Sequence, residues 1–446
     1  MLDVFSIHNA HWQAPETFEK TDPHLRELIG IPYAAPLDWW RDLLHAEGGL
    51  FILSGGRQIG KSTSLKLLIS ELLKEPRWQD SPRHIFYLPC DQIDDRRELY
   101  QLATTFLEGV GDDPFFLLVD EITFVAAWEK TLKGLADEGR FRHGVCIITG
   151  SDRLMLDEAA TALPGRRGGH ARVDFNLTAL TFRHYVALTN PELLEERDRL
   201  DAQHLEAIQD APYRDAAQRA FSDYLVCGGF LKPLNELHSL GAVRDATYRI
   251  YQNWVVGDFL KRGKRREFLT DVLGAIIDTL GSQVTYGGLS RRCMVSKDTL
   301  IDYVNLLVRM NVILLQKAFD QNKLAAHPKK AQKIAFRDPF ITEAMRRMVR
   351  PQKTIPESIV VENLVVAHHA RACPVFYIKA EGEVDLVVLE DTSFRPIEVK
   401  WTTQTRPKDL KQIQKYPNGR ILTRSMSPGI LAGIPTTPLV MALLSL

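Results

Sequence analysis

The chain has 446 residues, enough for roughly two to four domains with separate cores. Its 56 lysines and arginines balance 56 acidic residues, so contacts with nucleic acid must come from local basic patches. The five cysteines are scattered without a Cys-x-x-Cys pair, which argues against zinc or disulfide frameworks and favours a reducing cytoplasm. No apolar run reaches the ~18–20 residues of a membrane span, and a leader pattern is missing. These features predict a soluble cytoplasmic protein with no membrane partner.

The first part of the chain predicts a nucleotide site. After a lead-in to about Gly48, in which residues 39–44 are expected to pack a helix against a sheet, the run 50–53 predicts a strand and 64–74 a helix. Between them lies a phosphate-binding loop, Gly55-Gly56-Arg57-Gln58-Ile59-Gly60-Lys61-Ser62, followed by Thr63. Its glycines let backbone N–H groups surround phosphate oxygens, Lys61 reaches the β- and γ-phosphates, and Ser62 holds Mg²⁺. The spacing of the loop residues and the predicted strand and helix on either side both argue against a Gly-rich turn that binds nothing.

A second nucleotide element ends the apolar run 115–119. Asp120 and Glu121 follow it directly, as a buried parallel strand would deliver two carboxylates to the ligand-binding edge of a sheet. Asp120 is expected to reach Mg²⁺ through water, and Glu121 to act as general base on the attacking water. The alternative is that the two acids only begin the next helix.

Further strand-like runs at 85–88, 145–149 and 173–177 alternate with helical stretches, which predicts an α/β fold with a parallel sheet. Thr149 at the end of the run 145–149, or Ser151 shortly after it, can serve as a sensor of the γ-phosphate, or can simply end a strand and cap a helix. In the loop after residue 163, Arg166 or its neighbour can act as an arginine finger in its own subunit or in a neighbouring one. A solvated basic loop is an equal alternative.

The middle of the chain predicts a helical lid followed by a DNA-binding pattern. Residues 191–240 are helical and charged, and the basic cluster 261–266 reads mainly as a solvated face, with DNA contact as the minority interpretation. Residues 271–317 have the pattern of a winged helix-turn-helix, in which Ser296 caps the last helix. That helix would bury Leu300, Val304, Leu307 and Val308 and would offer Lys297, Asp298 and Asn305 outward. DNA binding is favoured only slightly over protein docking.

The C-terminal part carries a separate set of acids. Glu362 lies in a predicted helix from residue 357, Asp385 near the start of a predicted strand, and Glu398 and Lys400 on one face of the next strand. Carboxylates on neighbouring strands can hold one or two Mg²⁺ ions that activate water, while lysine stabilises charge on a phosphate. Amphipathic strands with solvated charges are the alternative, which the basic tail 400–420 disfavours.

Together these motifs resemble the prokaryotic AAA-type ATPases that carry a C-terminal restriction-endonuclease-like domain. Residues 56–63 resemble that family's G-x-R-x-x-G-K-S/T-T loop, although Gly56 stands where proline is usual. Residues 118–121 resemble its metal and water box, and residues 149–151 its sensor segment. Gly165-Arg166 is similar to its arginine segment and residues 228–230 to its lid turn. Glu362, Asp385, Glu398 and Lys400 fall on the PD-(D/E)xK nuclease positions, which implies a metal site at Asp385 and Glu398.

The expected organisation is an ATPase core over 1–190, a helical lid and basic linker over 191–265, a winged helix-turn-helix over 266–350 and a restriction-endonuclease-like α/β domain over 351–446. The expected function is Mg²⁺-dependent ATP hydrolysis coupled to binding or remodelling of double-stranded DNA, with a metal-dependent nuclease as an added expectation. Self-association through the ATPase core is a further expectation. The alternative is a nucleotide-controlled regulatory scaffold whose C-terminal domain binds DNA or protein without cutting.

Overall fold

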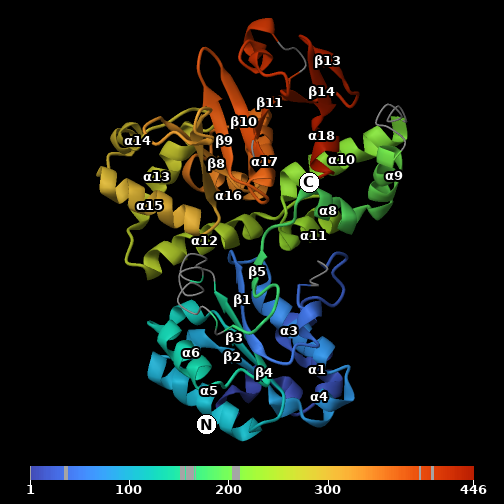
Figure 1. Cartoon of the computed structure of the whole chain (residues 1–446), viewed down its shortest axis with the longest axis vertical. Coiled ribbons are helices and arrows are strands. Elements are labelled where there is room, and N and C mark those ends of the chain that lie inside the picture. Colours follow the sequence, from blue (N-terminus) through green and yellow to red (C-terminus); the bar gives the residue numbers. More distant parts are fainter. Residues whose placement is uncertain are drawn as a thin grey trace. The chain divides into compact units, whose positions relative to one another are not determined.

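The computed structural model of the chain describes residues 2–34, 39–150, 156, 165, 167–202, 211–390, 393–402 and 406–446. The chain forms two compact units, residues 1–178 and residues 179–446. Figure 1 displays the elements of each unit. Within the described residues, no helix has both the length and the apolar character needed to cross a membrane.

The first unit is built on a parallel sheet in the order β2-β3-β4-β1-β5. Its strands are β1 (Gly49–Gly55), β2 (Ile85–Pro89), β3 (Phe115–Asp120), β4 (Gly144–Gly150) and β5 (Asp174–Leu177). Strands β1 to β4 are buried along their whole length, because helices cover both faces of the sheet. The predicted α/β fold with a parallel sheet is therefore confirmed for this unit.

Helices cover the sheet on two sides (Figure 1). One apolar core lies between the sheet and α5 (Arg96–Val110) and α6 (Trp128–Asp137). The other lies against α3 (Lys61–Leu72), α4 (Pro76–Asp80) and the lead-in. The described lead-in consists of short elements: η1 (Leu2–His8), η2 (Ala10–Trp12), η3 (Pro15–Thr17), α1 (Phe18–Thr21), α2 (Pro23–Arg26) and η4 (Arg41–Leu43). The helix expected over 39–44 is thus a single 3-10 turn, although Trp40 and Leu43 are buried in the core as expected.

The lead-in also covers the open edge of the sheet at β2. The Asn9 side chain donates to the Tyr87 carbonyl at 2.9 Å and accepts from the Tyr87 N–H at 2.8 Å. Trp12 Nε1 donates to the Ile85 carbonyl at 2.8 Å, and His11 Nε2 lies 3.0 Å from the same oxygen. These side chains satisfy backbone groups that an edge strand would otherwise leave unpaired.

The second unit contains helices and one large sheet. The described helices are α8 (Phe182–Thr189), α9 (Pro191–Ala202), α10 (Ala211–Cys227), α11 (Leu231–Leu240), α12 (Asp245–Lys261), α13 (Arg266–Asp278), α14 (Tyr286–Cys293), α15 (Lys297–Arg309), α16 (Pro339–Val349), α17 (Glu357–His369) and α18 (Leu439–Leu443). The sheet follows the order β13-β14-β12-β11-β10-β9-β6-β7, and β8 pairs with β6. Its strands are β6 (Ile313–Asp320), β7 (Ala325–Ala326), β8 (Gln332–Phe336), β9 (Val375–Lys379), β10 (Glu383–Glu390), β11 (Ser393–Lys400), β12 (Arg420–Thr423), β13 (Gly429–Leu431) and β14 (Ile434–Pro438).

Helices α13, α14 and α15 are followed by the antiparallel hairpin of β6 and β8. The Ser296 hydroxyl accepts from the Thr299 N–H at 3.1 Å, so the predicted cap is confirmed. Leu300, Val304 and Leu307 are buried, while Val308 is only half-buried.

Strand β8, which the sequence did not reveal, completes the hairpin. Strand β6 also pairs in parallel with β9, at Lys317–Phe376 and Ala318–Tyr377. The hairpin and the C-terminal strands therefore share one sheet.

Candidate functional site

The phosphate-binding loop joins the end of β1 to the start of α3. Gly60 caps the helix with φ 92°, in the left-handed region that favours glycine. A Cβ at Gly55 would lie 2.6 Å from the Leu177 carbonyl oxygen, so a larger residue does not fit there. Glycine is thus required at both ends of a loop whose N–H groups precede a helix N-terminus.

Lys61 lies at the first position of α3, and its side chain is only 4% exposed. Its Nζ donates to the carbonyl oxygens of Gly55 and Gly56, both at 3.0 Å. The same ammonium group lies 3.4 Å from Glu121 Oε1. The loop lysine and the carboxylate expected to act as base therefore face each other across the site.

Asp120 is held by two hydroxyl groups at the end of β3. The Tyr87 phenol donates to Oδ2 at 2.6 Å, and the Thr149 hydroxyl donates to Oδ1 at 2.5 Å. Burial, followed by the charge of Asp120, raises the pKa of Tyr87, so the phenol keeps its proton. The Ser62 hydroxyl acts in the opposite direction and lowers the pKa of Tyr87. Ser62 and Asp120 suit Mg²⁺, which keeps several waters and takes few protein oxygens.

Glu121 has a left-handed backbone with φ 52°. Its N–H donates to the Thr149 hydroxyl at 2.9 Å, while Oε2 is buried and has no hydrogen-bond partner among the described residues. An oxygen of this kind can accept a hydrogen bond from a water molecule. Thr149, expected as a γ-phosphate sensor, here ties β4 to both Asp120 and Glu121.

Lys66, on α3, is a component that sequence reasoning missed. Its buried ammonium lies 3.3 Å from Asp22 Oδ2 and 3.7 Å from the centre of the Tyr87 ring, and it also donates to the His8 carbonyl. Lys66 therefore joins the lead-in to the tyrosine that holds Asp120. The available signal was a lysine within the otherwise apolar stretch Leu65 to Ile69.

Two predicted residues, Ser151 and Arg166, lie outside the described residues. Arg167 is described and buried, with a bidentate ion pair to Asp174 at 2.7 and 2.9 Å. Its Nη2 also donates to the Val173 carbonyl at 2.7 Å, and its Nε to the Leu50 carbonyl at 3.3 Å. Arg167 thus stabilises the pairing of β1 with β5. Because its guanidinium already makes these contacts, the structure disfavours Arg167 as an arginine finger.

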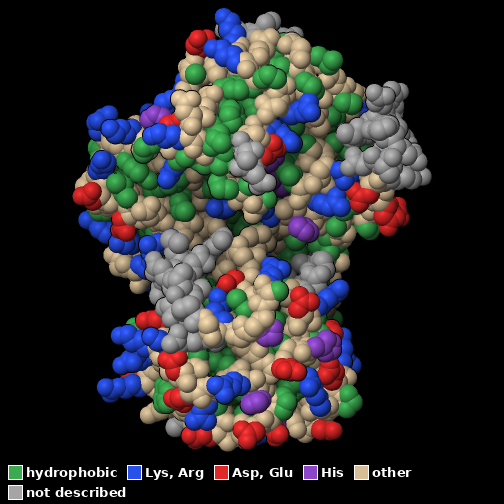
Figure 2. Space-filling view, in the orientation of Figure 1, with side chains coloured by type: hydrophobic (Ala, Val, Ile, Leu, Met, Phe, Trp, Pro, Cys, Tyr) green, Lys and Arg blue, Asp and Glu red, His purple; other side chains and the backbone are tan. Residues whose placement is uncertain are grey.

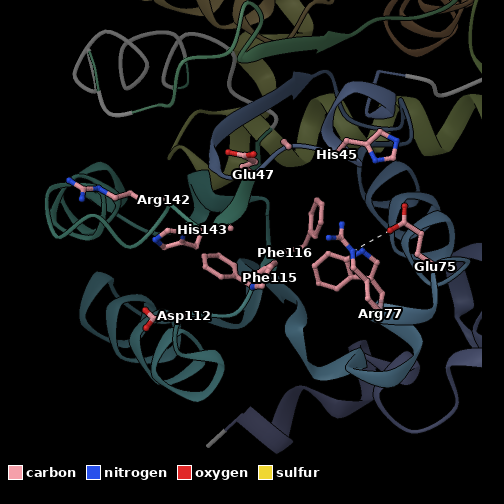
Figure 3. Close-up of a pocket in the computed structure, with 13 residues that line it drawn as sticks. His45, Glu47, Glu75, Arg77, Asp112, Phe115, Phe116, Arg142 and His143 are labelled. Atoms are coloured by element: carbon pink, nitrogen blue, oxygen red, sulfur yellow. Dashed lines mark ion pairs between the residues drawn. The ribbon is translucent and has the colours of Figure 1, made fainter.

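A cavity of ≈ 700 Å³ lies at the opposite edge of the same sheet. Phe115 begins β3 and Gly144 begins β4, whereas the phosphate loop follows the carboxyl end of β1. Figure 3 shows the Phe115 and Phe116 rings between His143 on one side and the Glu75–Arg77 ion pair on the other. This cavity is therefore separate from the nucleotide site.

Basic side chains predicted to contact DNA lie on and beside α13 to α15 of the second unit. Arg291, Arg292 and Lys297 are exposed, as are Asp298 and Asn305. Figure 2 shows lysine and arginine side chains over the part of this unit that these helices form.

The residues of the basic cluster before α13 differ in whether an acid pairs with them and in how exposed they are. Lys264 Nζ lies 2.6 Å from Asp302 Oδ2, whereas Arg265 and Arg266 are exposed. The Arg265 guanidinium lies 4.5 Å from the centre of the Phe268 ring.

The predicted C-terminal acids come together in the second unit. The Val399 N–H donates to Asp385 Oδ2 at 2.9 Å, which places Asp385 on β10 beside Glu398 on β11. Lys400 Nζ lies 2.5 Å from Glu398 Oε1. Burial, followed by the charge of Asp385, raises the pKa of Glu398 to about 8. The same two causes raise the pKa of Glu362 to about 7.

Sequence reasoning missed Lys333 on β8, whose ammonium lies 2.9 Å from Glu362 Oε1. Among the described residues, no group of three His, Cys, Asp or Glu side chains is placed to hold a metal ion. The acids expected to bind metal are therefore adjacent, but they face lysines.

Three models of known protein families match parts of the chain. A family model described as an AAA domain matches residues 47–186, which contain β1, α3 and the strands that carry Asp120 and Thr149. Two models described as domains of unknown function, DUF8612 and DUF4143, match residues 218–352 and 353–425. The parallel sheet and the phosphate loop agree with this match, which identifies residues 47–186 as an AAA-type domain.

Two curated relatives are uncharacterized proteins. The chain is 26% identical over 303 residues to one from Methanocaldococcus jannaschii and 23% identical over 290 residues to one from Haemophilus influenzae. These alignments cover 64% and 60% of this chain, and 60% and 62% of the relatives. The chain thus spans about three fifths of the length of these relatives.

Similar solved structures include a Walker-type ATPase of Pyrococcus abyssi, with a TM-score of 0.42 and 16% identity over 67% of this chain and 91% of that one. The Aeropyrum pernix ORC1 protein in complex with DNA has a TM-score of 0.35 and 14% identity over 73% of this chain and 91% of that one. At these TM-scores the likeness is too loose to support an inference about this chain.

Proposed function

We propose that the chain is a Mg²⁺-dependent ATPase whose hydrolysis is coupled to binding of double-stranded DNA. The observation that carries the ATPase part is the position of Lys61 at the start of α3, facing Glu121 across the site. Lys61 would compensate the phosphate charge, Ser62 and Asp120 would hold Mg²⁺, and Glu121 would accept a proton from the attacking water. Bound Mg²⁺ would neutralise charge on the transferred phosphoryl group.

Nucleotide binding is tested with Lys61→Ala and a fluorescent ATP analogue. Removing the ammonium leaves the phosphate charge uncompensated, so binding should fall below detection. Lys74→Ala is the matched control, because Lys74 lies just beyond α3 and is 61% exposed. Equal affinities for Lys61→Ala and Lys74→Ala would remove the basis of the proposal.

The proposed DNA surface consists of the exposed basic side chains on and before α13, α14 and α15. Each lysine or arginine that neutralises a phosphate releases a counterion, so log affinity should fall with log salt by roughly 0.9 per contact. Replacing Lys264, Arg265 and Arg266 with alanine should therefore flatten that slope. Lys264 should contribute least to the change, because Asp302 already pairs with it.

The matched control for the basic cluster is the double change of Lys130 and Lys133, exposed lysines on α6 of the other unit. It should leave the salt slope unchanged. Undetectable binding of duplex DNA at low salt would favour the alternative, a nucleotide-controlled scaffold in which α13 to α15 dock a protein.

The proposal also assigns two domain types within the second unit. Three helices followed by the β6–β8 hairpin support a winged helix-turn-helix. The succession of α17, β9, β10, β11 and β12, with β11 and β12 parallel, supports a restriction-endonuclease-like domain. For this domain we favour binding without cutting, because the Lys333 ammonium, which the nuclease motif does not include, pairs with Glu362 and lies 3.8 Å from Asp385. Loss of a Mg²⁺-dependent nicking activity in Asp385→Ala would reverse that preference.

A further inference from the structure

The second unit contains a buried lysine surrounded by acids. Lys333, on β8, has a side chain that is only 5% exposed. Its Nζ lies 2.9 Å from Glu362 Oε1 on α17 and 3.8 Å from Asp385 Oδ1 on β10. It also forms an ion pair with Glu383 at the start of β10. Three carboxylates from two elements thus converge on one ammonium group.

A fourth carboxylate lies next to one of these three, Asp385. Asp385 Oδ2 accepts from the Val399 N–H at 2.9 Å, which brings the adjacent residue Glu398 beside Asp385. Glu398 Oε1 pairs with Lys400 Nζ at 2.5 Å, while the buried Oε2 has no hydrogen-bond partner among the described residues. We call the four side chains the carboxylate centre: Glu362, Glu383, Asp385 and Glu398.

Most oxygens of the carboxylate centre already form hydrogen bonds or ion pairs with protein groups. Glu383 Oε2 accepts from Gln283 Nε2 at 2.7 Å, in addition to the pairing of Oε1 with Lys333. A divalent ion needs several oxygens together at about 2.0–2.6 Å, and an ammonium group among the same carboxylates prevents that approach. The described side chains therefore do not fit a metal ion in this arrangement.

Electrostatics explains why a cation is needed at this place. Buried carboxylates without a counter-charge are strongly unfavourable, because burial removes their hydration. Lysine supplies a compact charge with three donors on a flexible stem, which can serve several carboxylates at once. A bound divalent cation would meet the same need by direct coordination.

We propose that Lys333 is the resident cation of the carboxylate centre, and that the centre becomes a divalent-cation site when this ammonium group is removed. Lys333 belongs to the hairpin that follows α15, whereas the carboxylates belong to α17, β10 and β11. Its ion pairs therefore join the hairpin to the C-terminal strands without a metal. This goes beyond the proposed ATPase function and does not depend on it.

The test replaces Lys333 with methionine, which has similar length and no charge, in the full chain. Every protein also carries Asp120→Asn, so that the nucleotide site does not contribute a metal signal. Binding of Mn²⁺ is followed by electron paramagnetic resonance without nucleotide. Lys333→Met should bind one Mn²⁺ per chain at least about 10-fold more tightly than the protein with Lys333 intact, because carboxylate oxygens are released for coordination. Adding Asp385→Asn should abolish the gain.

The matched control is Lys379→Met. Lys379 lies on β9 and pairs with the same Glu383 at 3.6 Å, but its side chain is 46% exposed. The Lys379→Met change should not create a Mn²⁺ site, because the Lys379 side chain does not fill the carboxylate centre.

A thermal measurement covers the case in which Lys333→Met is poorly folded. Mn²⁺ should raise the Tm of Lys333→Met, or of Lys333→Gln, and should leave the protein with Lys333 unchanged. Two results would overturn the proposal. One is a Mn²⁺ site that already exists with Lys333 present and is lost in Asp385→Asn. The other is that neither Lys333 variant gains binding or stabilisation.

Discussion

The change Glu121→Gln should separate nucleotide binding from hydrolysis. It replaces a carboxylate with an amide of the same shape, so packing around the end of β3 should be kept. In the structure, Glu121 Oε1 lies 3.4 Å from Lys61 Nζ, while Oε2 has no hydrogen-bond partner among the described residues. The substitution therefore removes one ion pair and one proton acceptor, and these two losses have opposite effects on the assay.

Turnover should fall because an amide cannot take a proton from water. General-base catalysis typically contributes about 10²–10⁴ in rate, so we expect kcat to fall by at least about 100-fold. The affinity for ATP, in contrast, should rise. Lys61 must leave Glu121 to reach a phosphate, and a pair whose glutamate is 21% exposed contributes up to about 1 kcal/mol. Losing that pair should tighten ATP binding by up to about fivefold.

The assay measures phosphate release at saturating ATP and Mg²⁺, together with the Kd of a fluorescent ATP analogue. Glu138→Gln is the control, because Glu138 belongs to the same unit and its side chain is 40% exposed. It should change neither quantity. Equal rates of ATP hydrolysis in the wild type and Glu121→Gln would refute the assignment of Glu121 as base. Weaker ATP binding in Glu121→Gln would refute the argument from the ion pair.

Two further predictions concern stability. Asn9→Ala should lower the free energy of unfolding by about 2 kcal/mol or more in urea titrations, because the Tyr87 N–H and carbonyl at the edge of the sheet both lose their partner. Glu398 has a folded pKa of about 8 against an ordinary value of 4.5, so the unfolded chain releases its proton first as pH rises. The free energy of unfolding should therefore fall between pH 4.5 and about 8, and Glu398→Gln should flatten that decline.

Each stability prediction has a nearby control. Gln13→Ala changes an exposed polar residue of the lead-in and should leave stability within about 0.5 kcal/mol of wild type. Glu390→Gln changes a glutamate of β10 whose side chain is 39% exposed, and it should keep the pH dependence. An Asn9→Ala protein as stable as Gln13→Ala would contradict the role of Asn9. A pH profile shared by Glu398→Gln and wild type would contradict the assigned pKa.

The sequence by itself predicted the candidate nucleotide site. A phosphate loop is local, since its glycines, its lysine and the helix that follows lie within a few residues and leave a readable pattern. The acids that follow the buried run 115–119 were also readable, because parallel strands bring their carboxyl ends to one edge. The helix capped by Ser296 was found for the same reason, since a cap and an apolar stripe are local features.

Only the tertiary structure decided which distant residues complete each site. Tyr87 and Thr149 come from different strands and meet on Asp120, and Lys66 reaches back to Asp22 of the lead-in. Strand β8 is short and lies between basic residues, so no periodic pattern revealed it. Its Lys333 reaches carboxylates because β6 pairs with β9, a contact between segments some sixty residues apart. Such pairings depend on the burial and register of whole elements, which local propensity does not encode.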